Sequence, residues 1–183
     1  MQTQMQAQPF TTTHTPSAGH GPDVPAGVPS PVPVSDRAVE APGLPATPLP
    51  ARPSALIRAA LVDLRKVEAL PDIYRVNMDV WHRDHRGDSV CEVCLAGSAI
   101  SQSLGARPGE HRGPEDFDQE TTWKLYALNE FRVGNVHDGL CYLDRADLWH
   151  GAYTRTITEY AVSPEGFHRD MHKLAQDLEA AGM

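Results

Sequence analysis

Apolar residues between Ser54 and Leu70 recur at the spacing of an amphipathic helix. With about 3.6 residues per turn, one stripe of such a helix holds Ile57, Ala60, Leu61, Leu64 and Val67. Ser54 is a favourable N-cap residue, and Pro71 cannot continue a helix. The segment therefore predicts a first helix that buries one face.

The next segment, IYRVNMDVW at residues 73–81, alternates between apolar and polar positions. Period-two alternation is typical of a strand with one buried face, so we expect a strand at Tyr74–Trp81. The charged loop HRDHRGD follows, and Ser89 and Glu92 then match the S-x-x-E pattern of a capping box. The pattern predicts a second helix with Cys91 and Cys94 in its first turns.

A third helix is predicted for ETTWKLYALNEFRV, residues 120–133, after a loop rich in Gly, Pro and charge. Gly134 would end this helix. Its apolar face would hold Trp123, Ala127 or Leu128, and Phe131.

The apolar and polar positions at residues 135–149 do not indicate one type of secondary structure. A short helix there would bury Leu140, Cys141 and Leu143. YTRTITEYAV, residues 153–162, is rich in Thr, Tyr and β-branched residues and is expected to form a strand beside Tyr74–Trp81. Ser163 and Pro164 then open a last helix ending at Gly182, with a buried stripe of Phe167, Met171, Leu174 and Leu178.

Together these elements predict an α+β fold for residues 54–183. About four helices would pack on a small two-stranded antiparallel sheet in a single compact domain. The roughly 130 residues involved are enough for one hydrophobic core of ordinary size.

The first 53 residues differ in composition, since they hold twelve of the sixteen prolines and a single aromatic residue, Phe10. Such a segment buries too little apolar surface to offset the entropy lost on ordering, so a disordered tail is expected at residues 1–53. The start of the chain lacks the basic and apolar regions of a secretory signal, and no stretch approaches the roughly 18 apolar residues of a membrane span. We therefore expect a soluble cytosolic protein that does not bind membranes.

Charge restricts the class of partner. Residues 54–183 hold 14 Lys and Arg against 21 Asp and Glu, a balance of −7. A surface of this sign repels phosphate backbones and disfavours nucleic-acid binding. The three cysteines do not suggest a disulfide framework and suit a reducing compartment.

The strongest candidate for chemistry is the quartet His82, His85, Cys91 and Cys94. Zn²⁺ binds such sets of nitrogen and sulfur ligands tetrahedrally, so the quartet predicts a small zinc-binding module as one alternative. Against zinc, the capping box places the cysteine pair at a helix start while the histidine pair lies in a charged loop. The favoured interpretation is two solvated histidines beside two small, buried core cysteines.

Other chemistries find less support in the sequence. A redox pair would use C-x-x-C at a helix start, but Glu92 between the cysteines opposes thiolate formation. A Cys91 or Cys141 nucleophile with one of nine histidines has no specific pattern. His168 and His172 could chelate a metal at i, i+4, yet they flank the apolar stripe of the last helix and should face solvent. We therefore assign no catalytic, cofactor-binding or metal residue and expect a protein that is not an enzyme.

Gly97 stands among small residues, Leu95 to Ala99, inside the predicted second helix. Glycine costs about 1 kcal/mol against alanine at such a position, so it needs a reason. The close approach of another element, with Trp81 or Trp123 as its bulky counterpart, is the simplest.

The box around the cysteines resembles one found in a class of small proteins encoded by bacteriophages and prophages. Those proteins carry a Met-x-x-Trp strand end, a short polar loop, and C-x(2–3)-C-[ILV]-A-G opening a helix. The matching residues are Met78, Trp81, Cys91, Cys94, Leu95, Ala96 and Gly97. The resemblance spans about residues 56–134 and implies a phage or prophage origin and intracellular action, but brings no activity, substrate or site residue.

The sequence thus predicts a phage-type accessory protein that binds an unknown protein partner in the cytoplasm of the bacterial host. This prediction depends on the lack of catalytic motifs, the acidic domain and the phage resemblance.

Overall fold

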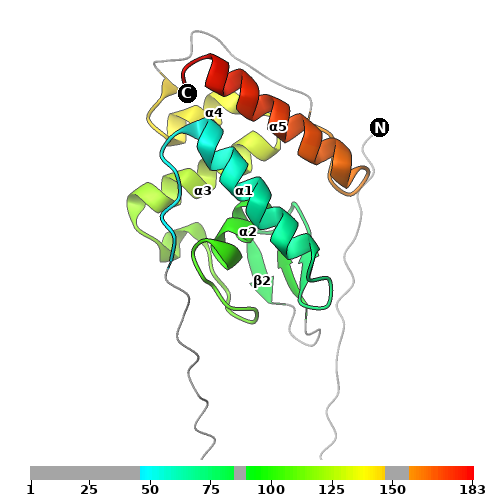
Figure 1. Cartoon of the computed structure of the whole chain (residues 1–183). Helices are drawn as coiled ribbons and strands as arrows, with labels where there is room; N and C mark the ends of the chain where they lie inside the picture. The colour runs from blue at the N-terminus through cyan, green and yellow to red at the C-terminus, as the bar shows by residue number, and fades with distance from the viewer. Residues whose placement is uncertain (1–45, 85–89, 147–156) are drawn as a thin grey trace, which may run out of the picture. The chain divides into compact units, whose positions relative to one another are not determined.

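The computed structural model describes residues 46–84, 90–146 and 157–183 (Figure 1). Residues 1–45 of the predicted tail lie outside this part. Residues 46–53 are described, and among them Leu49 is buried while the Thr47 N–H donates to the Ser103 carbonyl at 2.7 Å. The hydrophobic core of the domain therefore includes Leu49, which precedes Ser54.

Five α-helices and three short strands make up the described residues, which confirms the α+β class. The helices are α1 (Pro53–Glu68), α2 (Leu95–Gln102), α3 (Gln119–Arg132), α4 (Val136–Tyr142) and α5 (Pro164–Ala180). The strands are β1 (Tyr74–Val76), β2 (His82–Asp84) and β3 (Cys91–Val93), and a 3-10 turn, η1 (Pro114–Asp116), precedes α3.

The predicted two-stranded antiparallel sheet was wrong. The described sheet has three strands in the order β1-β3-β2, with β1 parallel and β2 antiparallel to β3. The alternation at residues 73–81 does not form one strand, because the Asp79 N–H donates to the Asn77 side chain at 3.0 Å and turns the chain. Of the predicted strand at residues 153–162, residues 153–156 lie outside the described part, and residues 157–162 form no strand.

The helix predicted from the capping box begins later than expected, at Leu95. Cys91 to Val93 instead form the central strand β3, and Ser89 lies outside the described residues. The Cys91 N–H donates to the Ile73 carbonyl at 2.8 Å, and β3 has a hydrogen-bonded neighbour on each side. Pairing on both edges of a strand outweighs a local capping signal, because it satisfies more backbone groups.

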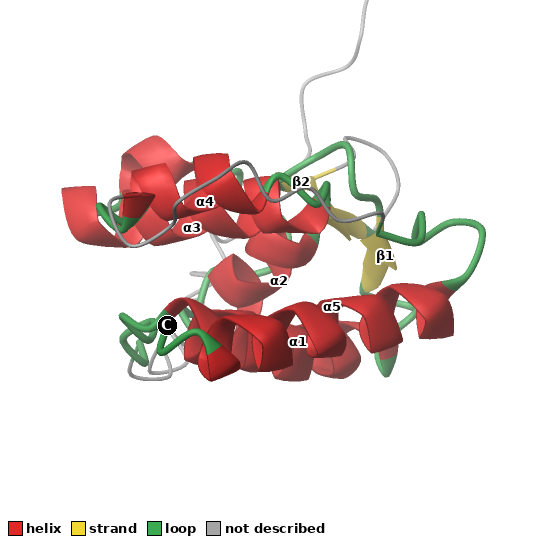
Figure 2. Ribbon diagram, turned by 90° about the horizontal axis from the view of Figure 1, so that it is seen from above, coloured by secondary structure: helices red, strands yellow, loops and turns green. Residues whose placement is uncertain are grey.

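The helices pack around α2. Figure 2 shows α2 between the α1–α5 pair and the α3–α4 pair, with the sheet at one end. Every residue of α2 from Leu95 to Ser101 is buried. Since small side chains dominate this helix, neighbours can approach it from all sides.

Gly97 lies at the closest of these approaches, which confirms the expected reason for a glycine. A Cβ at Gly97 would lie 1.4 Å from the carbonyl oxygen of Trp81. The same oxygen accepts a hydrogen bond from the Cys94 N–H at 3.2 Å. The counterpart of Gly97 is therefore the backbone of Trp81.

The outer helices follow the sequence pattern with local exceptions. The stripe of α1 is buried as predicted, but the helix begins at Pro53, and the Ser54 hydroxyl donates to the Met183 carbonyl instead of capping. In α3, Trp123 is 41% exposed, whereas Lys124 is buried with its ammonium 2.7 Å from the Leu49 carbonyl. In α4, Leu140 is buried but Cys141 is exposed, contrary to prediction.

The last helix, α5, agrees best with its pattern. The Ser163 hydroxyl accepts from the Gly166 N–H at 3.1 Å, as expected of an N-cap. Its predicted apolar residues are buried, namely Phe167, Met171, Leu174 and Leu178.

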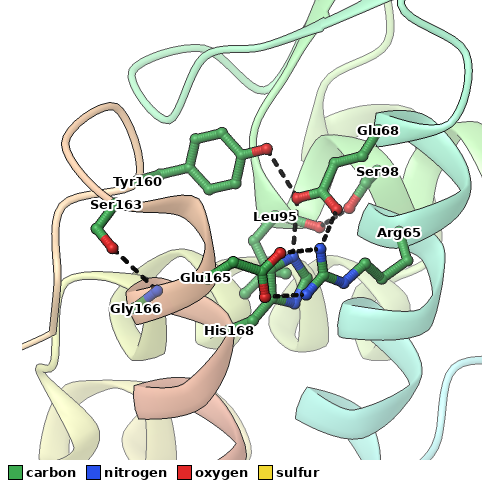
Figure 3. A network of polar contacts seen from close by, with 9 residues as sticks. All are labelled: Arg65, Glu68, Leu95, Ser98, Tyr160, Ser163, Glu165, Gly166 and His168. Carbon is green, nitrogen blue, oxygen red and sulfur yellow. Dashed lines mark hydrogen bonds and ion pairs between the residues drawn. The ribbon is translucent and has the colours of Figure 1, made fainter.

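A partly buried polar network joins α5 to α1 (Figure 3). One carboxylate oxygen of Glu68 accepts from the Tyr160 hydroxyl at 2.7 Å and lies 2.8 Å from His168 Nε2. Arg65 contacts Glu68 at 3.0 Å and holds Glu165 through two nitrogens at 2.9 and 2.8 Å. These contacts join the C-terminal end of α1 to the first turns of α5 and to the segment before it.

His168 belongs to this network, so its predicted solvent exposure was wrong. Its side chain is only 3% exposed, and its Nδ1 has no hydrogen-bond partner among the described residues. Nε2 carries a proton in this contact, because the Glu68 carboxylate can only accept. Glu68 explains why a histidine can lie inside the apolar stripe of α5.

Substituting Gly97 by alanine is expected to destabilise the domain by at least about 3 kcal/mol, because the new methyl group would overlap the Trp81 carbonyl. Denaturant unfolding measures the change. Gln176→Ala at an exposed position of α5 is the control and should stay within about 0.5 kcal/mol of wild type. A Gly97→Ala domain as stable as wild type would contradict the close approach.

Removing single members of the polar network should also cost stability. Tyr160→Phe is expected to lose about 1 kcal/mol, and His168→Ala more, since it removes both the contact with Glu68 and a side chain that is only 3% exposed. His172→Ala, one turn further along α5 and exposed, is the matched control. Equal effects of His168→Ala and His172→Ala in thermal unfolding would show that the network adds nothing.

Candidate functional site

The predicted zinc quartet is only partly brought together. His82 and Cys91 are in contact, with His82 Nε2 3.7 Å from the Cys91 sulfur. Cys94 directs its sulfur elsewhere, and His85 lies outside the described residues. Zinc binding by the quartet stays a prediction. Of its four members, the described residues bring only His82 and Cys91 into contact.

His82 is a buried strand residue, so its predicted place in a solvated loop was wrong. It is 1% exposed and pairs with Val93 across the antiparallel β2–β3 ladder. Burial lowers its pKa below the ordinary value of 6.5, and a hydrogen bond to the Glu110 backbone opposes this in part. The ring is therefore held in its neutral form beside the Cys91 thiol.

Cys91 and Cys94 are buried, as the favoured interpretation expects, but they pack in different parts of the core. Cys91 packs in a small cluster with Val67, Tyr74 and Val93. Cys94 packs in the main core and is the N-cap of α2, where its sulfur accepts from the Gly97 N–H at 3.4 Å.

Burial also determines how the thiols can react. It raises the pKa of the Cys94 thiol, which keeps the sulfur protonated. A redox or nucleophilic role requires an accessible thiolate, and Cys91 and Cys94 are each only 1% exposed. This arrangement favours a structural role for both.

The exposed cysteine, Cys141, lies beside both a histidine and an aspartate. Among the described residues, one group of three could hold a metal, formed by His137, Asp138 and Cys141. His137 Nδ1 lies 3.3 Å from Asp138 Oδ1 and 3.9 Å from the Cys141 sulfur. This group was not predicted from the sequence, although H-D-x-x-C places its residues at i, i+1 and i+4 of a helix over α4.

Four aromatic side chains gather on another part of the surface. This aromatic surface comprises Trp81 after β1, Trp123 and Tyr126 on α3, and Tyr142 on α4. The Trp81 and Tyr126 rings meet edge to face at 5.4 Å, and Tyr126 stacks on Tyr142 at 5.2 Å. Trp123 and Tyr142 remain 41% and 38% exposed.

Two hollows flank the aromatic surface. One, of about 280 Å³, is bounded by Trp81, Tyr126 and the buried His82, with Arg83 and Arg112 among its other residues. The second, of about 220 Å³, is lined by Trp123 and Tyr142 together with Arg145.

The lining of these hollows combines aromatic rings with charged side chains. No Ser, Thr or Cys of the described residues lines either hollow, and the Lys124 ammonium in the second is already held by Glu120 at 2.6 Å. Rings and guanidinium groups instead offer flat apolar area with hydrogen-bond donors at its edge. The four aromatic residues come from three separate segments, so only the packing of α3 against α4 and the sheet could reveal this surface.

The chain was compared with known proteins. No protein-family model, no curated protein and no solved structure matches it. None of the described helices is both long and apolar enough to cross a membrane. The function must therefore be inferred from the geometry of this chain.

Lowering the pH from about 7 to about 5 is expected to reduce the free energy of unfolding, in part through His82. Because the folded state lowers the pKa of His82, the unfolded chain binds this proton more tightly. The stability due to the neutral ring is full above the unfolded value of 6.5 and is lost as the pH falls below it. Denaturant unfolding at several pH values measures this dependence.

Two variants isolate the contribution of His82 to this dependence. His82→Gln should show a shallower loss of stability with falling pH than wild type. Gln176→Ala, at an exposed and uncharged position, should keep the wild-type slope. An unchanged slope in His82→Gln would rule out a contribution from this ring.

Proposed function

We propose that this chain is a phage-type accessory protein that binds a protein partner in the cytoplasm of a bacterial host, without catalysing a reaction. The aromatic surface is the observation that carries this proposal. Trp123 and Tyr142 leave a large part of their rings in water and line one hollow together, and Tyr142 also stacks on Tyr126. Single exposed apolar residues are ordinary, but a cluster of this kind is typical of an interaction surface.

The composition of the surface supports a protein as the partner. Trp, Tyr and Arg are the residue types that contribute most to protein interfaces, and all three occur at the two hollows. Aromatic rings bury much area and lose little conformational entropy when they are fixed. A partner with apolar side chains that enter the hollows would fit this surface.

Nucleic acid is a less suitable partner. Tyr126 and Tyr142 stack on each other at an interplanar angle of 22°, so each offers at most one face to a base. Arg83 lies 3.1 Å from Glu92, and Arg112 lies 3.3 Å from Glu110, which reduces their attraction for phosphate. The acidic balance of the chain acts in the same direction.

The phage origin in this proposal depends on the resemblance around the cysteines. Three of the residues that carry it, Trp81, Cys94 and Gly97, meet where the sheet joins α2. This junction also positions the Trp81 ring at the aromatic surface. Proteins that share this box would therefore share the residues that support the aromatic surface. This is consistent with an accessory protein that binds a partner.

Capture experiments test this function. Immobilised full-length chain should retain a specific protein from bacterial lysate, and Trp123→Ala or Tyr142→Ala should weaken binding of that purified protein by about 30-fold. Leu70→Ala is the matched control, because Leu70 is also 41% exposed but lines neither of the two hollows. Calorimetry with the purified partner measures each affinity, and circular dichroism checks that each variant is folded.

Two outcomes would contradict the proposal. If wild type and both aromatic variants bind the partner with equal affinity, the aromatic surface does not contribute to binding. Tight binding of single-stranded DNA or RNA that is lost in Trp123→Ala would make nucleic acid the partner instead.

A further inference from the structure

Helix α4 presents three metal-capable side chains on its outward side. Its inward side is formed by Val136, Gly139 and Leu140, which are buried, with Gly139 against the Phe131 ring. The side chains of His137 and Asp138 are 42% and 54% exposed, and Cys141 is exposed. The group is therefore open to ions from solvent and is separate from the quartet around Cys91.

The distances within the group match those between the ligands of one metal ion. Zinc bonds of about 2.3 Å to sulfur and about 2.0–2.1 Å to nitrogen or oxygen, at tetrahedral angles, separate sulfur from nitrogen by about 3.6 Å and nitrogen from oxygen by about 3.3 Å. The observed separations from His137 Nδ1 are 3.9 Å to the Cys141 sulfur and 3.3 Å to Asp138 Oδ1. Small side-chain rotations would complete a three-ligand site.

The same geometry argues against a Cys–His–Asp catalytic relay. In such a relay the thiol and the carboxylate contact opposite nitrogens of the imidazole ring. Here both the Cys141 sulfur and the Asp138 carboxylate lie next to Nδ1. Convergence on a single nitrogen fits ligands that share a metal ion.

Neighbouring residues orient the Asp138 carboxylate. The Asn135 side-chain amide donates to Asp138 Oδ2, which leaves Oδ1 directed toward His137. The Asn135 amide is also 3.4 Å from Glu130 Oε2, and the Asn135 N–H donates to the Glu130 carbonyl at 2.9 Å. Such outer partners orient metal ligands and raise affinity.

We propose that His137, Asp138 and Cys141 form a site for a divalent transition-metal ion of the zinc class. One nitrogen, one sulfur and one oxygen ligand suit Zn²⁺ or Co²⁺, whereas Mg²⁺ and Ca²⁺ prefer oxygen alone. Binding forms a metal–sulfur bond and releases the thiol proton to solvent. Three protein ligands leave a fourth position for water or for a group from another molecule, and the site does not depend on the proposed function.

Titration of the reduced full-length chain with Co²⁺ tests this site, because thiolate coordination to Co²⁺ gives a charge-transfer absorption band. Wild type should bind one Co²⁺ with this band, and Zn²⁺ should displace it. Cys141→Ser should abolish the band, and His137→Asn should weaken the affinity at least about tenfold. Because these positions are exposed, neither variant should unfold the domain, which circular dichroism checks.

Two control variants separate this site from other donors. Cys91→Ala removes the buried cysteine of the quartet, and His111→Asn removes an exposed histidine elsewhere. Both should keep the wild-type band and affinity. No band in wild type, a band that survives Cys141→Ser, or a band lost in folded Cys91→Ala would each overturn the proposal.

Discussion

The described domain depends on the contact between the Trp81 carbonyl and helix α2. The oxygen accepts from the Cys94 N–H and lies so close to Gly97 that no Cβ fits between them. This contact docks the sheet onto the central helix beside the buried first residue of β2, His82, and the Trp81 ring meets Tyr126 edge to face. A glycine at one position of α2 thus connects the core with the surface proposed to bind a partner.

Polar contacts add to the packing around the central helix α2 by joining two of the outer helices. Glu68 gathers Arg65, Tyr160 and His168, so that α5 is fixed to α1 by directional bonds as well as by its apolar stripe. A network of this kind rigidifies a structure only when its members are paired, and here only His168 Nδ1 lacks a partner among the described residues. The two candidate functional regions, the aromatic surface and the α4 group, lie outside this network, where side chains remain accessible.

The helices were predictable because their signals are local. The stripes of α1 and α5 follow from apolar spacing, and Pro71 and Ser163 mark where such helices stop and start. The strands were not predictable in the same way. Whether Cys91 begins a helix or a strand depends on β1 and β2 lying on both its sides, and the capping pattern contains no information about those neighbours.

The sequence by itself determined the α+β class, the positions of the long helices, the need for a close approach at Gly97 and the burial of Cys91 and Cys94. Only the tertiary structure decided which side chains meet. It separated Cys94 from His82 and Cys91, buried His82 and His168, exposed Cys141 beside His137, and brought together aromatic rings from three separate segments. The physical reason is that periodicity fixes the face on which a residue lies, whereas contacts between faces depend on how whole elements pack.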